Sequence, residues 1–347
     1  MIYNRSLQDF FTNSKRKNDQ LTPFLLGRNA FVYLIQCLKI ETIILPCFIC
    51  PLVVDIFKNS GIKIYFYSNL DKNLETPINS IIEEISNIKI TEQTFFLWHD
   101  YLNLIGDMPE KLYELLEQKK IQPIIDATHS LPGKDYKCQN VVFGFRKLLN
   151  QPFGALLKTT SKSNPPLITL PYIKSIKFLL AFKIKTNILI MFKGFENGLI
   201  NYFLKKIITL TDYYSFDKNN HFINHSYHYD KIIDIHSQLD YQKIESRRNQ
   251  NFLQYSINFP KNLNIKIFNT SCPFGFPLVT KNNVLLRSHL WGKGVHSFLL
   301  WRYLHEDALE YNDKDSSFLS KSTLILPVNQ DLTINDINKI SKIINDY

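Results

Sequence analysis

The stretch Ile124-Ile125-Asp126-Ala127-Thr128-His129-Ser130 decides how the rest of the sequence is interpreted. An apolar run that ends directly in an aspartate is typical of a buried strand with a polar group at its carboxyl end. That carboxylate can serve a bound ligand, or it can cap the helix that follows. The stretch leaves both possibilities open, so its neighbours have to decide between them.

Short β-rich runs alternate with helical patterns on both sides of this stretch. The alternation predicts an α/β fold with a mostly parallel sheet and helices on both of its faces. Ligands of such sheets bind beyond the carboxyl ends of the strands. We expect strands over 42–45, 63–67, 93–98 and 123–126, and helices over 50–59, 78–86 and 110–119.

The pattern changes in the second half of the chain, which indicates a second domain. We expect an N-terminal extension over 1–20, a large domain over 21–205 and a smaller α+β domain over 206–347, in which 206–230 is a loop or lid. The smaller domain is expected to contain a helix over 231–257, short strands over 265–268 and 278–279, and a closing helix over 334–346.

The net charge of +10 favours an anionic partner. The basic residues are spread along the chain and form no known nucleic-acid motif, so a phosphorylated small molecule is favoured over nucleic acid.

The N-terminal residues lack the apolar run of a secretory signal. Lysines interrupt the longest apolar stretch, 173–210, so we expect a cytoplasmic protein without stable membrane insertion.

Metal binding is not expected. Five cysteines are too few for a disulfide scaffold, and the pair Cys47 and Cys50 has no second pair with which to complete a zinc site. We interpret that pair as part of the core. A histidine-rich segment is interpreted as facing solvent, and its members are His221, His225, His228 and His236.

Two further stretches can belong to the same site as Asp126. Gly27-Arg28-Asn29-Ala30 precedes a helical run over 31–38, and free N–H groups at a helix N-terminus can bind a phosphate. Taken alone, this glycine is a helix cap. Phe143-Gly144-Phe145-Arg146-Lys147 is expected to end a strand about 20 residues after Asp126. A lysine with a lowered pKa can form an imine and move protons.

A phosphate turn, a strand-end aspartate and a lysine in this order suggest a pyridoxal-phosphate (PLP) site. In such a site a carboxylate faces the pyridine nitrogen and keeps it protonated. The chain resembles the DegT/DnrJ-type family of nucleotide-sugar aminotransferases, in the branch with an Arg-Lys-x-Leu lysine motif. The stretches that carry the resemblance are 27–30, 45–50, 126–130 and 144–154, followed by weaker matches over 244–249, 276–278, 290–295 and 324–330.

The resemblance implies a PLP-dependent transferase fold of type I and an aminotransferase that works as a homodimer with a shared active site. It implies that Lys147 holds the cofactor as a Schiff base and that Asp126 faces the pyridine nitrogen. His129 would lie near the phenolic oxygen of the cofactor. The turn Gly27-Arg28-Asn29-Ala30 would hold the phosphate, and either His99 or Tyr101 would stack on the ring.

The chain departs from the family pattern near the lysine. The family has serine where this chain has Gly144, so one hydrogen bond to the phosphate would be absent. The loss of that hydrogen bond would weaken cofactor binding by about 0.5–1.5 kcal/mol. The segment Pro152-Phe153-Gly154-Ala155 also differs. The predicted function is transfer of an amino group from a donor such as glutamate to a keto group of a nucleotide-linked sugar. The alternatives are a PLP-dependent dehydratase or lyase, and a noncatalytic scaffold that retains the fold.

Overall fold

The computed structural model describes residues 21–24, 26–90, 93–149, 154–161, 234–260 and 272–347. The expected extension 1–20, the loop 206–230, the strand 265–268 and the apolar stretch 173–210 lie outside these residues. His221, His225 and His228 lie outside them as well. His236 is described and is buried against Tyr241, so the expectation that it faces solvent is wrong. Within the described ranges, no helix combines the length and the apolar composition that are needed to span a bilayer.

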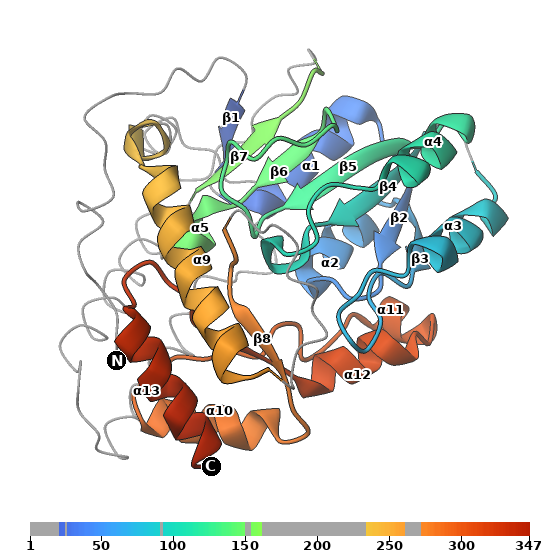
Figure 1. The fold of residues 1–347 in the computed structure, drawn as a ribbon. Coiled ribbons are helices and arrows are strands. Elements are labelled where there is room, and N and C mark those ends of the chain that lie inside the picture. The colour runs from blue at the N-terminus through green and yellow to red at the C-terminus, as the bar shows by residue number, and fades with distance from the viewer. Residues whose placement is uncertain (1–20, 25, 91–92, 150–153, 162–233, 261–271) are drawn as a thin grey trace, which may run out of the picture.

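A seven-stranded sheet forms the centre of the first half of the chain (Figure 1). The strand order is β1-β7-β6-β5-β4-β2-β3, and only β7 runs antiparallel to its neighbours. The expected α/β fold with a mostly parallel sheet is therefore confirmed. The strands are β1 (Leu21–Phe24), β2 (Thr42–Pro46), β3 (Lys63–Tyr67), β4 (Thr94–His99), β5 (Gln122–Ala127), β6 (Val141–Phe143) and β7 (Ala155–Lys158).

Helices cover both faces of this sheet. In β4, Phe95 and Leu97 pack on the face that carries α1 (Gly27–Leu38) and α2 (Pro51–Asn59). Phe96 and Trp98 pack on the opposite face, against α3 (Ile78–Asn87) and α4 (Glu110–Gln118). All six residues of β4 are buried, because a strand covered on both faces has no solvent side.

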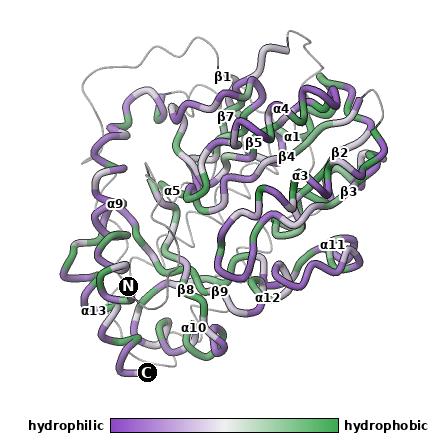
Figure 2. Tube along the Cα trace, turned by 45° about the vertical axis from the view of Figure 1, so that its right-hand side comes forward, coloured by the Kyte–Doolittle hydropathy of each residue, from purple (hydrophilic) through white to green (hydrophobic). Residues whose placement is uncertain are grey.

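Local sequence explains where these helices begin and which side they bury. Pro51 starts α2, where its missing N–H costs no helical hydrogen bond, and Glu110 places a negative charge in the first turn of α4. Hydrophobic and hydrophilic residues alternate along the helices in Figure 2, as expected for helices with one face on the sheet. The expected helices over 50–59, 78–86 and 110–119 are confirmed to within two residues.

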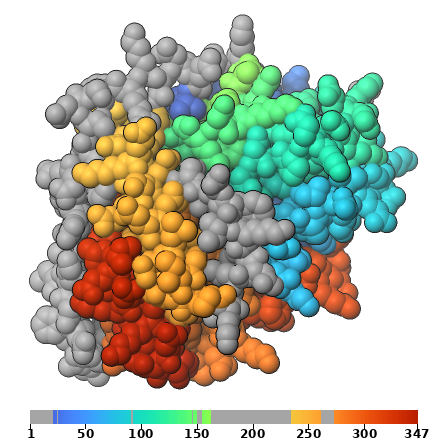
Figure 3. Space-filling model, viewed as in Figure 1, coloured from blue at the N-terminus to red at the C-terminus, as the bar shows by residue number. Residues whose placement is uncertain are grey.

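In the described residues of the C-terminal part, helices accompany a second, two-stranded sheet. The strands β8 (Phe276–Val279) and β9 (Thr323–Leu326) pair antiparallel. In Figure 3, α9 and α13 lie side by side on the surface. The expected closing helix is confirmed, and Thr333 and Asp336 cap it reciprocally. The helices are α9 (Tyr241–Asn258), α10 (Asn283–Gly292), α11 (Glu306–Glu310), α12 (Lys314–Ser322) and α13 (Ile334–Asn345).

The helix expected over 231–257 differs at its start. In the structure α9 begins at Tyr241, because the Asp240 carboxylate accepts a hydrogen bond from the Lys243 N–H and caps the helix there. A separate helical turn covers 234–238. The hydrophobic periodicity of this stretch did not reveal that Asp240 separates two helical segments.

Arg248 on α9 joins the two parts of the molecule. Its buried guanidinium donates to the carbonyl oxygens of Pro273 and Phe274, at 2.9 and 2.7 Å, and to the Gln330 side chain at 2.8 Å. The Gln330 side chain in turn donates to the carbonyl oxygen of Leu148 on α5 (Phe145–Leu149), at 3.4 Å.

We predict that Arg248→Met destabilises the protein by about 3 kcal/mol, because several buried acceptors lose their donor. Urea unfolding of the variant and the parent measures this difference. Arg247→Met, on the same helix, is the matched control and is expected to change stability by less than about 0.5 kcal/mol. Equal losses in the two variants would contradict a joining role for Arg248.

Candidate functional site

A pocket of about 330 Å³ opens at the carboxyl ends of the parallel strands. It brings together the three stretches that the sequence singled out: Gly27 at the start of α1, Asp126 at the end of β5, and Gly144 and Lys147 after β6. The other lining residues are Leu26, Arg28, Phe31, Cys50, Leu52, Val53, Thr128, Arg146, Gly154, Leu299, Leu300 and Trp301.

Asp126 is the buried acid of this pocket. Its Oδ2 lies 3.1 Å from Nδ1 of His99, and its Oδ1 accepts a hydrogen bond of 3.0 Å from the Thr128 N–H. Burial by itself raises the pKa of the carboxyl, but His99, Lys147 and the Thr128 hydrogen bond outweigh burial and lower it. Asp126 is therefore a carboxylate at neutral pH.

Lys147 lies on α5, in the first turn after β6, and not at the end of the strand as the sequence suggested. Its side chain is open to the pocket. Loss of hydration lowers the pKa of its amine, and Arg146 adds to this effect, while Cys50 and Asp126 act against it. A lysine in this environment gives up its proton more readily than a surface lysine does.

The N-terminus of α1 opens to the same pocket at Gly27 and Arg28. Helix N–H groups and the two guanidinium groups of Arg28 and Arg146 make this end of the pocket attractive to an anion. Asn29 is buried, and its Oδ1 accepts a hydrogen bond from the Leu26 N–H at 3.1 Å. Ala30 packs in the core. The side chains of Asn29 and Ala30 thus do not line the pocket.

Thr128 was not recognised from the sequence, although it lies between the two glycines. A Cβ added at Gly27 would stand 2.8 Å from Cγ2 of Thr128, and a Cβ at Gly144 would stand 2.5 Å from its carbonyl oxygen. The absence of a side chain at Gly144 is therefore a steric requirement of this fold. A serine at this position could not offer its hydroxyl without a shift of the backbone.

Four rings surround the inner wall of the pocket. Trp301 lines it and packs against His99, Tyr101 and His129, with ring centroids 5.1, 5.7 and 5.8 Å away. His99 and Tyr101, the two candidates for stacking on a cofactor ring, are buried behind Trp301 and do not line the pocket. Of the two, His99 contacts Asp126. The sequence carried no signal for Trp301, which lies 175 residues after Asp126.

His129 is held as a neutral ring. Its Nδ1 accepts a hydrogen bond from the Leu102 N–H at 3.2 Å, which assigns the ring proton to Nε2. Burial lowers the pKa of His129 well below its usual value, and Lys147 and His99 lower it further. Among the described residues, the Nε2–H of His129 has no hydrogen-bond acceptor.

The segment that carries Leu102 is fixed by the buried carboxylate of Asp100. Asp100 accepts hydrogen bonds from Lys134 at 2.7 Å and from Tyr136 at 2.6 Å. It also accepts from the N–H groups of residues 105 and 106. Leu102 and Asn103 have φ angles of 54° and 58°, a left-handed conformation that such bonds must hold in place.

The cysteine pair and one possible metal-binding group have clear places. Cys47 is buried and Cys50 lines the pocket, and both are free thiols. In the part of the chain that the structure describes, one group of side chains could hold a metal ion, namely His305, Glu306 and Asp307 on α11 and its cap. Lys58 already bonds both carboxylates, at 3.2 and 2.7 Å, and supplies a positive charge there.

This arrangement brings groups that attract an anion into the same pocket as a proton-accepting amine and a carboxylate. The sheet order, the single reversed strand and the site at the strand ends define an α/β fold that binds its ligand beyond the carboxyl ends of parallel strands. No protein-family model and no curated protein matches the sequence, whereas many solved structures match the fold.

Three solved structures illustrate the likeness. A DegT DnrJ EryC1 StrS aminotransferase from Brucella abortus superposes with a TM-score of 0.60 at 13% identity, over 94% of this chain and 85% of that chain. A sugar aminotransferase from Streptococcus pneumoniae in its PMP form gives 0.62 at 14% identity, with the same coverage. A PLP-dependent aminotransferase from Bacillus cereus gives 0.56 at 15% identity, over 98% and 88%. At these identities the likeness establishes the fold, which is the fold that the sequence motifs predicted.

We predict that Gly144→Ala destabilises the protein by about 1–3 kcal/mol, because the new methyl group meets the Thr128 backbone. Thermal or urea unfolding measures the loss. Gly292→Ala is the control, since a Cβ at Gly292 meets nothing within 4 Å. A Gly144→Ala variant as stable as the parent would show that the backbone at Thr128 can yield.

Proposed function

We propose that this protein is a PLP-dependent aminotransferase that delivers an amino group to a keto group of a sugar. The observation that carries the proposal is the meeting of Lys147 and Asp126 in one pocket that the N-terminus of α1 also lines. The structural likeness to sugar aminotransferases supports it.

The residues of the pocket fit the cofactor. The start of α1 with Arg28 and Arg146 would hold the phosphate, Asp126 would pair with the pyridine nitrogen, and Lys147 would bind the aldehyde covalently. The close approach of Gly144 to Thr128 leaves backbone instead of a side chain at the phosphate end. When bound, PLP supplies an electron-withdrawing ring that stabilises the negative charge left when a bond to the substrate carbon breaks.

The residues of this chain move and hold the protons of such a reaction. Lys147, with its lowered pKa, is suited to take a proton from one carbon and return it to another. Asp126 keeps its negative charge and so keeps a pyridinium proton in place. His129 stays neutral, but it is buried and does not line the pocket, while Trp301 and its neighbouring rings exclude water from that side.

The finer features of the proposal come from the family resemblance. The acceptor would be a nucleotide-linked sugar in polysaccharide or glycoconjugate synthesis, and its phosphates would suit the charge of +10. The amino donor would be an amino acid such as glutamate. The protein would work in the cytoplasm as a homodimer with a shared active site, and size-exclusion chromatography with light scattering tests that state.

We predict that PLP added to the purified protein produces an absorption band at about 400–430 nm that borohydride traps as a stable adduct on Lys147. Glutamate should then bleach this band as the amino group moves to the cofactor. Lys147→Arg keeps the positive charge but cannot form the bond, so it should show neither band nor adduct. Lys293→Ala, at an exposed position on the surface, should behave as the parent does.

Other outcomes of this experiment separate the alternatives. A trapped adduct whose band does not respond to any amino acid donor would favour a PLP-dependent dehydratase or lyase. Absence of a band at saturating PLP would overturn the enzyme proposal and favour a noncatalytic scaffold. Equal trapping in the Lys147→Arg variant would show that another lysine reacts.

We also predict the direction of the pH dependence of loading. Only the neutral amine attacks the aldehyde, and the pKa of Lys147 lies below the usual value of about 10.4 for lysine. The rate of adduct formation should therefore rise with pH and level off before pH 10.4. Stopped-flow absorbance measures this profile, and a rate that still rises steeply through pH 10.4 would contradict the lowered pKa.

A further inference from the structure

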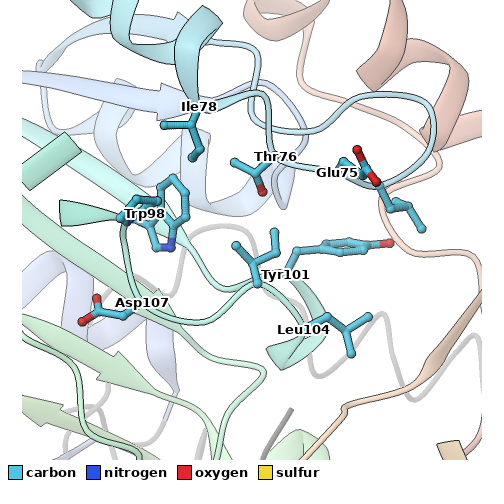
Figure 4. A pocket seen from close by; sticks show the side chains of 10 residues that line it. Glu75, Thr76, Ile78, Trp98, Tyr101, Leu104 and Asp107 are labelled. Atoms are coloured by element: carbon cyan, nitrogen blue, oxygen red, sulfur yellow. The ribbon is translucent and has the colours of Figure 1, made fainter. Parts of the chain in front are cut away.

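A second pocket, of about 280 Å³, lies beside the candidate site at the carboxyl ends of β3 and β4 (Figure 4). None of its lining residues lines the first pocket. The two pockets are separated by a pair of rings, since Tyr101 lines the second, Trp301 lines the first, and their centroids are 5.7 Å apart. Apart from Tyr101, none of the residues that line this second space was expected to belong to a site.

One wall of the second pocket is a turn that its own hydrogen bonds hold in place. Asp71 Oδ1 accepts hydrogen bonds from the N–H groups of Asn73 and Glu75, at 2.8 and 2.9 Å. These bonds hold Leu74 in a left-handed conformation with a φ of 65°. Figure 4 shows the side chains of Glu75, Thr76 and Ile78 along this wall.

The facing wall is equally fixed. The Trp98 indole donates to the carbonyl of Gly106 at 3.0 Å, and the Asp100 carboxylate binds the N–H groups of Ile105 and Gly106. Asp107 accepts from the Tyr113 hydroxyl at 2.8 Å and from a backbone N–H at 2.8 Å. Because both walls are held by their own hydrogen bonds, the space between them is preformed.

The walls would suit a ligand with an apolar body. Rings and aliphatic side chains dominate the lining, including Ile78, Trp98, Tyr101 and Leu104. A cavity of about 150 Å³ is known to hold benzene. A pocket of about 280 Å³ therefore has room for one six-membered ring with a short side chain.

The charge of the pocket indicates that the polar group of such a ligand is positively charged. Two carboxylates line it, those of Glu75 and Asp107, and no lysine or arginine does. Asp107 has its own donors, whereas the Glu75 carboxylate has no hydrogen-bond partner within the described parts of the chain. The chain as a whole carries a net charge of +10, and the first pocket is lined by Arg28, Arg146 and Lys147. The second pocket is therefore negative in a molecule that is positive overall.

We propose that the second pocket binds a small organic cation, a single apolar or aromatic ring that carries a primary ammonium group. The ring would lie between Trp98 and Tyr101, where aromatic faces also attract a cation. The ammonium would pair with Glu75. The occupant would touch the Tyr101 ring, which packs against Trp301 and His99 of the first site. This inference does not depend on the proposed function, because it uses no residue that lines the PLP pocket.

The test compares 2-phenylethylamine with 3-phenylpropanoate, which have the same ring and similar length but opposite charge. Each is titrated into the full-length protein by calorimetry, with tryptophan emission as a second signal. The amine should bind at least about tenfold more tightly than the acid, a difference of about 1.4 kcal/mol. Equal binding of the two probes, or no binding of the amine, would overturn the proposal.

Two variants locate the binding. Glu75→Gln should remove the preference for the amine, while Glu83→Gln, at an exposed position on α3, should retain it. Thr76→Trp should fill the space and abolish binding, with circular dichroism to confirm that the variant is folded. Unchanged selectivity in Glu75→Gln, or binding retained in a folded Thr76→Trp variant, would place the cation elsewhere and reject this site.

Discussion

The pairing of β5 with β4 and β6 is the constraint on which the candidate site depends. In this register His99 stands beside Asp126, and Ala127 stands beside Phe143. A shift by one residue would turn the carboxylate to the other face of the sheet. Because all three strands are parallel and buried on both faces, their carboxyl ends meet at one edge, and Gly144 and Lys147 follow directly from the end of β6.

A buried carboxylate at this edge requires partners, and the surrounding structure supplies them. His99, the Thr128 N–H and Lys147 keep Asp126 charged, while burial keeps His129 neutral. The loop that orients His129 is in turn held by Asp100. The same loop forms one wall of the second pocket, so a single buried acid supports two neighbouring spaces of opposite charge.

Much of the first site could be predicted from local patterns. Asp126 and Gly27 lie where a strand ends and a helix begins, and such boundaries are visible in a sequence. Lys147 was placed in the correct stretch but at a strand end, because one turn of helix after β6 has too few residues to show a period. The capped start of α9 at Asp240 was missed because the cap lies inside a continuous helical pattern. The buried bonds of Arg248 were missed because their acceptors lie outside its own helix.

The sequence by itself determined the order of strands and helices, the α/β class and the three stretches that reach the pocket, because hydrophobic period and turn residues act over a few positions. Only the tertiary structure decided that Trp301 covers the inner rings, that Thr128 excludes a side chain at Gly144, and that Glu75 faces a second pocket. These contacts join residues distant in the chain, and their geometry follows from how whole elements pack, which no local pattern records.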